Sequence, residues 1–260
     1  MASARRLTRR SVREAERLFL AEGPQAVREA LRVESATAVR RIFATSEAVD
    51  RHADVVVLAA SSQVSIDIVP AKALRELSGT VTPQGLVAVC SFFDVSLDVA
   101  LASRPALVAV LVQARDPGNA GTVVRTADAA GAGAVVLTDG SVDVYNGKCV
   151  RASAGSVFHL PVSVGASLGT TVTALRASGL QILAADGSGE LDLDTAASAG
   201  RLVSPTAWLF GNEAWGLPEK VRDMADAVLR VPIYGRAESL NLATAAAVCL
   251  YASAQRQRSG

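Results

Sequence analysis

Two segments in the C-terminal part of the chain combine glycines with small polar side chains in a way that suits a bound nucleotide. The first, Gly211–Pro218, has the sequence Gly-Asn-Glu-Ala-Trp-Gly-Leu-Pro and directly follows an apolar run. The second consists of Val231–Ile233 and then Glu238–Leu242, Glu-Ser-Leu-Asn-Leu. Glycine lets the backbone approach a ligand closely, and the start of a helix presents unpaired amides to it. We therefore interpret both segments as parts of a binding site rather than of the core.

A third segment, Asp116–Ala132, lies between apolar runs at 106–112 and 134–138. Asp116 and Pro117 are typical of a helix N-cap and first turn, and Gly131 is typical of a C-terminal stop. The pattern predicts a helix over Gly118–Ala130.

This helix carries two polar residues that are able to act on a substrate, Asn119 and Arg125. They are six residues apart, which is roughly 240° around a helix, so they do not share a face if both are helical. We therefore expect Asn119 to act from the loop or the first turn. Arg125, with Thr122 beside it at the three-residue spacing, projects toward a substrate.

Taken in order, the three segments resemble motifs 1, 2 and 3 of the SpoU/TrmH family of RNA 2′-O-ribose methyltransferases, in the SPOUT superfamily. The resemblance spans roughly residues 105–256. Any one motif alone carries little weight, and it is their order and spacing that identify the chain as similar to this family.

The resemblance implies S-adenosyl-L-methionine as the methyl donor, with the backbone of motifs 2 and 3 wrapped around its adenosine part. No metal is required, because the positive charge of the sulfonium already activates the leaving thioether. In this chain, the residues at the positions that wrap the adenosine in the family are small or aliphatic. The predicted donor-binding residues are Leu209, Gly211, Asn212, Gly216, Val231, Ile233, Leu240 and Asn241.

The resemblance also makes Arg125 the residue that activates the ribose 2′-hydroxyl. Arginine is too weak an acid to serve as a free base at neutral pH. We therefore predict a bidentate grip on the adjacent phosphate and stabilisation of the developing alkoxide, with the proton passing to that phosphate or to water. Glu213 and Ser239 are expected to orient groups, and Asn241 to pair with backbone or with Asn119. The predicted catalytic residues are Asn119, Arg125, Glu213, Ser239 and Asn241.

Two features of these motifs leave alternatives open. Arg125 has Asp128 at the i, i+3 spacing, so a surface salt bridge is the competing interpretation of this arginine. Motif 2 has Ala214 where the family frequently has glycine, followed by the bulky Trp215. This tryptophan is expected to cover the donor or to pack at a subunit contact.

The formal net charge of +1 does not itself indicate nucleic-acid binding, but its distribution does. Residues 1–41 contain ten arginines and five glutamates, an excess of +5. Phosphate contacts require local positive charge rather than a basic average. Arg151–Ser156 also resembles a family segment near the RNA, although a strand-to-loop capping role is equally open. The predicted RNA-binding residues are Arg5, Arg6, Arg9, Arg10, Arg125 and Arg151.

The elements predicted around these motifs divide the chain into an N-terminal domain at 1–93, a linker at 94–104 and a C-terminal domain at 105–260. The N-terminal part is predicted as a small α/β domain, and Phe19–Pro24 and Thr82–Val89 resemble the ribosomal-protein-like RNA-binding domain that precedes many family members. Its expected strands are Arg17–Ala21, Arg41–Thr45, Asp54–Ala59, Ile66–Val69 and Gly85–Ser91, and its expected helices are Pro24–Val33 and Ala71–Leu77.

From Pro105 onward, alternating strands and helices predict an α/β domain with a parallel sheet covered by helices on both faces. The family resemblance adds a deep trefoil knot, which periodicity cannot indicate. The expected strands are Ala106–Val112, Ala134–Leu137, Gln181–Ala184, Thr206–Phe210 and Ala227–Ile233, and the expected further helices are Thr170–Ala177, Pro218–Met224 and Ser239–Arg256.

Composition restricts the remaining possibilities. No apolar run approaches the roughly 18 residues of a membrane span, and Ser11–Glu14 has the form of a helix capping box rather than of a targeting segment. We therefore expect a cytoplasmic protein with no membrane partner. Three separated cysteines and two histidines indicate buried reduced thiols and no metal site.

Three other functions are weighed against this prediction. A nicotinamide-dependent dehydrogenase is disfavoured because no Gly-x-Gly-x-x-Gly turn follows a strand and opens a helix. A catalytically silent RNA-binding homologue is disfavoured by the full set of polar motif residues. Ribosomal RNA is favoured as substrate over transfer RNA by the N-terminal domain, but the modified nucleotide, and a housekeeping or an antibiotic-resistance role, stay open. The family resemblance also implies a homodimer, with the alanine-rich helix Ser239–Arg256 as a packing surface.

Overall fold

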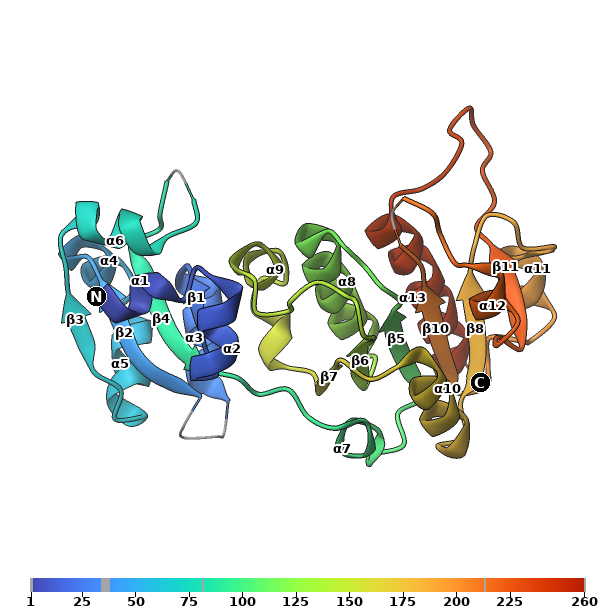
Figure 1. Cartoon of the computed structure of the whole chain (residues 1–260), viewed down its shortest axis with the longest axis horizontal. Coiled ribbons are helices and arrows are strands. Elements are labelled where there is room, and N and C mark those ends of the chain that lie inside the picture. The colour runs from blue at the N-terminus through green and yellow to red at the C-terminus, as the bar shows by residue number, and fades with distance from the viewer. Residues whose placement is uncertain (1, 34–37, 81, 213, 260) are drawn as a thin grey trace. The chain divides into compact units, whose positions relative to one another are not determined.

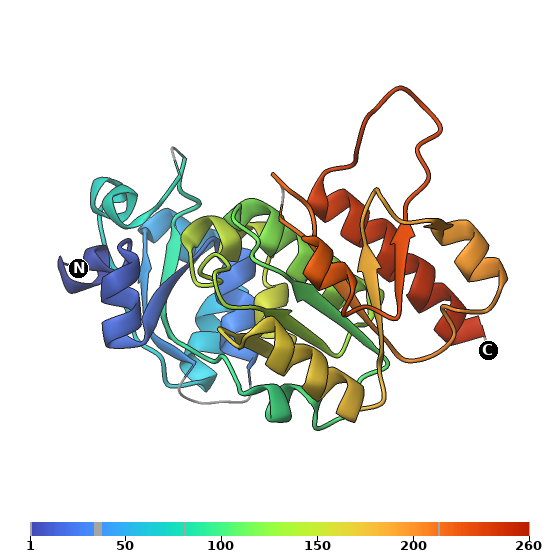
Figure 2. The same cartoon turned by 45° about the vertical axis from the view of Figure 1, so that its right-hand side comes forward.

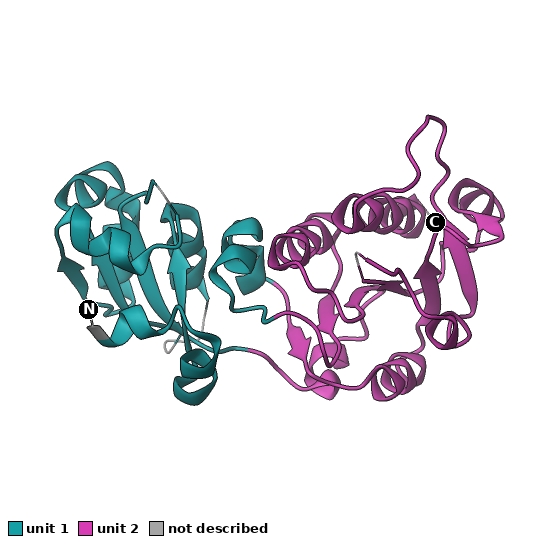
Figure 3. Ribbon diagram, turned by 45° about the horizontal axis from the view of Figure 1, so that its top comes forward, with its two compact units in different colours: residues 1–93, 143–159 teal, residues 94–142, 160–260 magenta. Residues whose placement is uncertain are grey.

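The computed structural model describes residues 2–33, 38–80, 82–212 and 214–259. The chain forms two compact units (Figures 1 and 3). Unit 1 comprises residues 1–93 together with 143–159, and unit 2 comprises residues 94–142 and 160–260. Residues 143–159 therefore cluster with the N-terminal part of the chain, although they lie inside the sequence range predicted as the C-terminal domain.

Unit 1 is built on a mixed sheet with the strand order β1-β4-β2-β3. Strand β4 is antiparallel to β1 and β2, whereas β2 and β3 are parallel. Helices α1 and α6 cover one face, where Leu7, Phe43 and Leu74 belong to one apolar cluster. The strands are β1 (Leu18–Glu22), β2 (Val39–Ala44), β3 (Ile66–Ile68) and β4 (Leu86–Ser91), and the helices are α1 (Ala2–Arg6), α2 (Arg10–Glu16), α3 (Pro24–Arg32), α4 (Ser46–Arg51), α5 (Ala53–Ser61), α6 (Ala71–Leu77) and α9 (Gly147–Ala152), with a 3₁₀ turn at Ser156–Phe158.

The strand predicted at Asp54–Ala59 is wrong, because this segment is helix α5. Val55 and Ala59, four residues apart, are both buried, whereas Val57 between them is 64% exposed. A strand with Val55 inward would have buried Val57 as well, since side chains alternate with a period of two. The run of valines suggested a strand, but tertiary packing selects the helical period.

Unit 2 contains a fully parallel sheet, as predicted, with the order β7-β6-β5-β10-β8-β11-β9. Helices α8 and α13 lie side by side on one face (Figures 1 and 2). The strands are β5 (Leu107–Leu111), β6 (Ala134–Leu137), β7 (Val162–Val164), β8 (Gln181–Ala185), β9 (Leu191–Asp192), β10 (Thr206–Phe210) and β11 (Ala227–Arg230), and the helices are α7 (Leu97–Leu101), α8 (Pro117–Ala130), α10 (Leu168–Ala177), α11 (Leu193–Ser198), α12 (Glu219–Arg222) and α13 (Leu242–Ser259).

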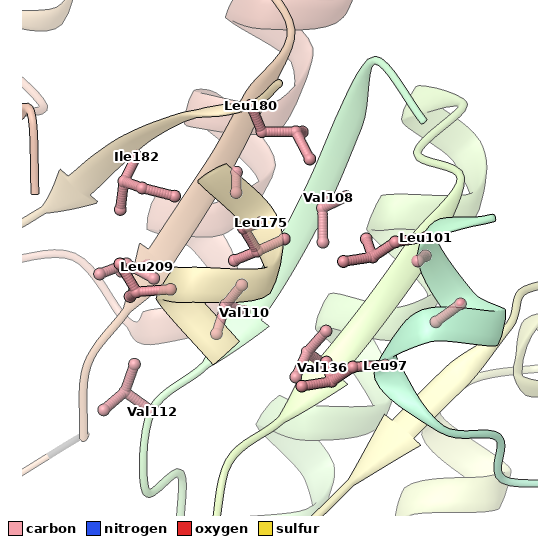
Figure 4. Packing of buried hydrophobic residues seen from close by; sticks show 14 of the residues in the cluster. Leu97, Leu101, Val108, Val110, Val112, Val136, Leu175, Leu180, Ile182 and Leu209 are labelled. Atoms are coloured by element: carbon pink, nitrogen blue, oxygen red, sulfur yellow. The ribbon is translucent and has the colours of Figure 1, made fainter. Parts of the chain in front are cut away.

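The opposite face of this sheet carries the apolar cluster of Figure 4. Val108 and Val110 of β5, Ile182 of β8 and Leu209 of β10 pack there with Leu175 of α10. Their alternation along each strand follows from the period of two. Because the sheet is covered on both faces, its strands are almost continuously apolar, as the sequence indicated.

Two further expectations differ from the structure. The region predicted as a linker at 94–104 contains helix α7, whose Leu97 and Leu101 are buried in the core of unit 2. The capping box expected at Ser11–Glu14 is wrong, because α2 begins at Arg10 and its N-cap is Arg9.

The three cysteines are free and buried, as predicted. Burial raises the pKa of the Cys249 thiol to about 12. Among the described residues, no helix has the length and apolar character needed to span a bilayer.

Candidate functional site

The parallel sheet of unit 2 reverses its strand order between β5 and β10. From β5 the sheet extends through β6 to β7 on one side, whereas β10 and the strands beyond it lie on the other. The last residues of the two strands, Leu111 and Phe210, are paired. Ligands of α/β sheets bind outside the carboxyl ends of the strands at such a reversal. The segments that leave these two strands are motifs 1 and 2.

Motif 2 forms a tight turn directly after β10. A Cβ atom on Gly211 would lie 2.4 Å from the carbonyl carbon of Gly216 and 2.5 Å from its oxygen, so only glycine fits. The backbones of Asn212 and Gly216 exchange two hydrogen bonds of 3.0 and 2.9 Å. The buried side chain of Asn212 donates to the carbonyl of Gln113 over 2.8 Å. This bond ties motif 2 to the loop that leads from β5 into motif 1.

Asp186, at the end of β8, supports the same turn from the other side. Its Oδ2 accepts from the amide of Leu217 over 3.2 Å. Burial alone would raise the pKa of the Asp186 carboxyl, but hydrogen bonds from Ser188 and Leu217 and the charge of Arg222 outweigh it and hold that pKa below its ordinary value. The carboxylate therefore stays ionised and fixes the turn.

Helix α8 presents motif 1 as predicted, with Asp116 as N-cap, its side chain accepting from the amide of Asn119 over 2.9 Å, and with Gly131 left-handed at the C-terminal end. Asn119 is thereby placed in the first turn. Arg125 lies six residues, or about one and two-thirds turns, further along and is exposed. The hydroxyl of Thr122 donates to the carbonyl of Gly118.

Motif 3 joins motif 1 through a pair of side-chain amides. The Nδ2 of Asn241 donates to the Oδ1 of Asn119 over 3.1 Å. The Oδ1 of Asn241 accepts from the amide of Ala243 at the start of α13. Asn241 was expected to pair with backbone or with Asn119, and it does both. The three motifs are thus connected at one edge of the sheet.

The remaining predicted residues differ in how they are placed. The side chain of Leu209 is fully buried in the core, so only its backbone is available to a ligand. Val231 and Leu240 are half-buried, whereas Ile233 and Ser239 are exposed in the long loop between β11 and α13 (Figure 1). Glu213 lies outside the described residues.

Two contributors to this edge were missed from the sequence. Gln113 supplies a carbonyl from a left-handed conformation, with φ 51°, and nothing in its residue type indicates this. Asp186 is different, because a carboxylate directly after a predicted parallel strand is a recognisable signal. The guanidinium carbon of Arg115 lies 5.6 Å from the ring centroid of Trp215 in a cation–π contact, so the bulky residue of motif 2 lies against the loop that leads into motif 1.

Comparison with known proteins identifies this arrangement. Residues 106–251 match the SpoU rRNA Methylase family, and residues 20–95 match the RNA 2′-O ribose methyltransferase substrate binding family. The chain belongs to the SpoU rRNA methylase family. The predicted family resemblance is confirmed, and so is its N-terminal extension to a substrate-binding domain.

Several SpoU relatives and structures are similar over much of the chain. The 23S rRNA (guanosine(2553)-2′-O)-methyltransferase RlmP of Bacillus subtilis (strain 168) is 40% identical over 182 residues, which cover 69% of this chain and 68% of RlmP. The crystal structure of an AdoMet-bound rRNA methyltransferase from Sinorhizobium meliloti superposes with a TM-score of 0.84 at 30% identity, covering 98% of this chain and 93% of that one. The SpoU methyltransferase AviRb from Streptomyces viridochromogenes, in complex with AdoMet, gives 0.83 at 28% identity, covering 100% and 98%.

The arginines predicted to bind RNA, other than Arg125, lie in unit 1 of this SpoU protein. Arg5, Arg6, Arg9 and Arg10 are exposed on α1, α2 and the turn between them. Arg5 forms a surface ion pair with Glu76, and Arg10 forms one with Glu14. Arg151 lies in the last turn of α9, an element that the sequence patterns did not predict, and pairs with Glu22 of β1.

Proposed function

We infer that this protein transfers a methyl group from S-adenosyl-L-methionine to the 2′-hydroxyl of a ribose in ribosomal RNA. The observation that carries the inference is the connection of three motifs at one edge of the sheet, through the Asn212–Gln113 and Asn241–Asn119 hydrogen bonds. The 40% identity to a 23S rRNA 2′-O-methyltransferase and the AdoMet-bound structural neighbours support the same reaction.

The residues at this edge suit the donor. The backbones of Gly211 and Gly216 approach each other too closely for any side chain on Gly211, and Ile233 offers an aliphatic surface that is 38% exposed. An aliphatic surface packs against the adenine ring, and backbone N–H and C=O groups form hydrogen bonds with the polar edge of that ring. When bound, the donor supplies an electrophilic methyl group on a sulfonium. Among the described residues, no three His, Cys, Asp or Glu side chains are grouped so as to hold a metal ion.

Arg125 is the residue we assign to the acceptor. As an exposed guanidinium on α8, it is suited to grip a phosphate with two parallel hydrogen bonds and to stabilise the alkoxide that develops on the ribose. Asn119 and Asn241, which share a hydrogen bond, are assigned to position the ribose as it approaches the donor. Ser239 and Glu213 are assigned to orient groups around the transfer.

We assign the remaining predicted arginines to RNA recognition. Arg5, Arg6, Arg9 and Arg10 are exposed close together along the first two helices, and a cluster of this kind supplies sequence-independent attraction to phosphates. Arg151 is assigned to the same substrate. Because the proposed substrate is ribosomal RNA, we place the activity in the cytoplasm.

A homodimer with a trefoil-knotted C-terminal domain completes the proposal. Helix α13 exposes Val248 by 39% and Tyr251 by 52%, and exposed apolar and aromatic side chains on one helix suit a subunit contact. Sedimentation that gives only monomer at micromolar concentration would contradict the dimer.

Substitution of Arg125 tests the proposed reaction. Arg125→Ala should lower tritium transfer from labelled S-adenosyl-L-methionine to a 23S rRNA transcript by about 10²-fold or more, because the charge that grips the phosphate and stabilises the developing alkoxide is removed. Donor affinity, measured by calorimetry, should be retained. The matched control is Arg176→Ala, which removes an exposed arginine of the same unit and should keep full transfer.

Full activity of Arg125→Ala would refute the role of this arginine. A wild-type protein that binds the donor but labels no RNA would favour the silent RNA-binding homologue. Mapping of ribose methylation in RNA from cells with and without this chain identifies the modified nucleotide.

A further inference from the structure

Unit 1 contains two cavities beside the Glu22–Arg151 ion pair, with volumes of about 200 and 370 Å³. Both are lined by these two side chains. The smaller also includes Tyr145 and Lys148, and the larger includes Thr80. We call them the Arg151 cavities. All their lining residues belong to unit 1.

The guanidinium of Arg151 is held in place by a buried carboxylate. The side chain of Glu22 is only 8% exposed. It accepts hydrogen bonds from Nη1 of Arg151 over 2.9 Å, from the hydroxyl of Thr80 over 2.6 Å, from the amide of Gly79 over 3.2 Å and from the hydroxyl of Ser78. Four donors leave this carboxylate fully satisfied, so it fixes the arginine without needing a ligand.

Two glycines leave room for this arginine. A Cβ atom on Gly79 would lie 2.9 Å from Nη1 of Arg151 and 3.3 Å from Nη2, and one on Gly147 would lie 3.3 Å from Nη1. Within the described part of the chain, Nε and Nη2 donate to no protein acceptor. The side chain is 29% exposed, so these two N–H groups are available to an anion that enters the cavities.

The charges around Arg151 favour phosphate. Arg13 also lines the smaller cavity, but its charge is compensated by Asp143, with side chains only 5% and 10% exposed. Lys148 adds an exposed ammonium group. A planar, pre-positioned guanidinium beside an ammonium is a typical phosphate contact.

We propose that the Arg151 cavities bind a nucleotide of the substrate RNA through its phosphodiester, as a contact separate from the ribose that is methylated. Arg151 and Lys148 bind the phosphate, and Glu22 is a positioning residue that acts through Arg151. The proposal rests on RNA being the substrate, as inferred above.

Salt dependence of RNA binding tests the proposal. The full-length protein is titrated with a 23S rRNA transcript at several salt concentrations, and the slope of log affinity against log salt is compared between variants. Loss of one phosphate contact reduces this slope by roughly 0.7–0.9. Arg151→Gln and Lys148→Gln should each reduce it by about that amount. The control, Arg28→Gln, removes an ion-paired arginine of the same unit that lines neither cavity, and should keep the wild-type slope.

The outcomes separate this site from the reaction itself. If both variants fold, bind the donor and keep the wild-type slope, the proposed cavity contact is refuted. Lys148→Gln keeps the test decisive if Arg151→Gln fails to fold, because Lys148 is exposed. Methyl transfer by the wild type to the same transcript is measured in parallel, and its absence would refute the proposed function rather than the cavity contact. Glu22→Gln combined with Arg151→Gln should lower the slope no further than Arg151→Gln alone.

Discussion

The polar residues assigned to the reaction in unit 2 and the charged residues paired inside unit 1 differ in their exposure. In unit 2, the residues assigned to the reaction lie at the edge of an apolar sheet, and Arg125 and Asn241 are exposed. In unit 1, whose surface also carries exposed arginines, the Arg13–Asp143 ion pair is almost completely covered, with side chains 5% and 10% exposed. Glu22, in the ion pair with Arg151, is 8% exposed.

The exposure of a polar side chain determines whether its substitution tests function without also changing stability. An exposed polar side chain contributes little to folding, so its removal should change chemistry and leave stability unchanged. A buried ion pair is different, because removal of one partner leaves an uncompensated charge in the interior. In unit 1, therefore, a loss of RNA binding has to be separated from a loss of structure.

The largest effect on stability is expected from Arg13→Ala. Arg13 donates to Asp143 through Nε and Nη2, over 2.9 and 2.5 Å, and to the carbonyls of Leu7 and Thr8. Its removal leaves Asp143 buried and unpaired, which should destabilise unit 1 by about 3–5 kcal/mol. Hydrogen exchange of the amides in β1 and β4 should therefore accelerate, whereas exchange in β10 of unit 2 should not.

Arg10→Ala is the matched control on the same helix. Arg10 forms an exposed i, i+4 pair with Glu14, and its loss should cost no more than about 0.5 kcal/mol. Equal exchange rates in the two variants would contradict the claim that the stability of unit 1 depends on the buried Arg13–Asp143 ion pair.

Much of the secondary structure of unit 2 could be predicted from the sequence, because each element is determined by residues that lie close together in the chain. Asp116, Pro117 and Gly131 define both ends of α8 through hydrogen bonding and backbone conformation within a few residues. The strand at Thr206–Phe210 is an apolar run of the length that a buried parallel strand needs. The segment at Asp54–Ala59 satisfied the same rule and is a helix, since periodicity alone does not separate short apolar elements.

The contacts that assemble the sites are the part that no sequence pattern indicates. Glu22 and Arg151 are 129 residues apart in the chain, and Asn119 and Asn241 are 122 apart. The second pairing was expected only because a family resemblance placed both residues at one site. Nothing comparable pointed to Glu22, whose role depends on a short helix, α9, that has too few residues for a periodic signal.

A smaller effect, confined to unit 2, is expected from Ser253→Ala. The indole N–H of Trp208 donates to the hydroxyl of Ser253 over 2.9 Å, and both residues are fully buried. Alanine leaves this donor unsatisfied, which should destabilise unit 2 by about 1–3 kcal/mol. Both tryptophans of the chain lie in unit 2, so unfolding followed by tryptophan fluorescence reports on this unit. Ser259→Ala, at an exposed position of the same helix, should shift the transition negligibly; an equal shift would contradict the role of the buried bond.

The smallest effect is a pH dependence at the edge of the reaction site. Because the pKa of Asp186 is lower in the folded protein than in the unfolded chain, its stabilising contribution is complete above the unfolded pKa of about 4 and is lost as the pH falls through the lower, folded value. The stability difference between wild type and Asp186→Asn in unit 2 should therefore be constant from pH 7 to 5 and shrink below pH 4. A difference that stays unchanged down to pH 2 would mean that the hydrogen-bond geometry at Leu217, and not the charge of Asp186, holds the motif 2 turn. In that case the charge of Asp186 would contribute nothing to the stability of unit 2, whereas the stability of unit 1 would depend on the charges of the Arg13–Asp143 ion pair.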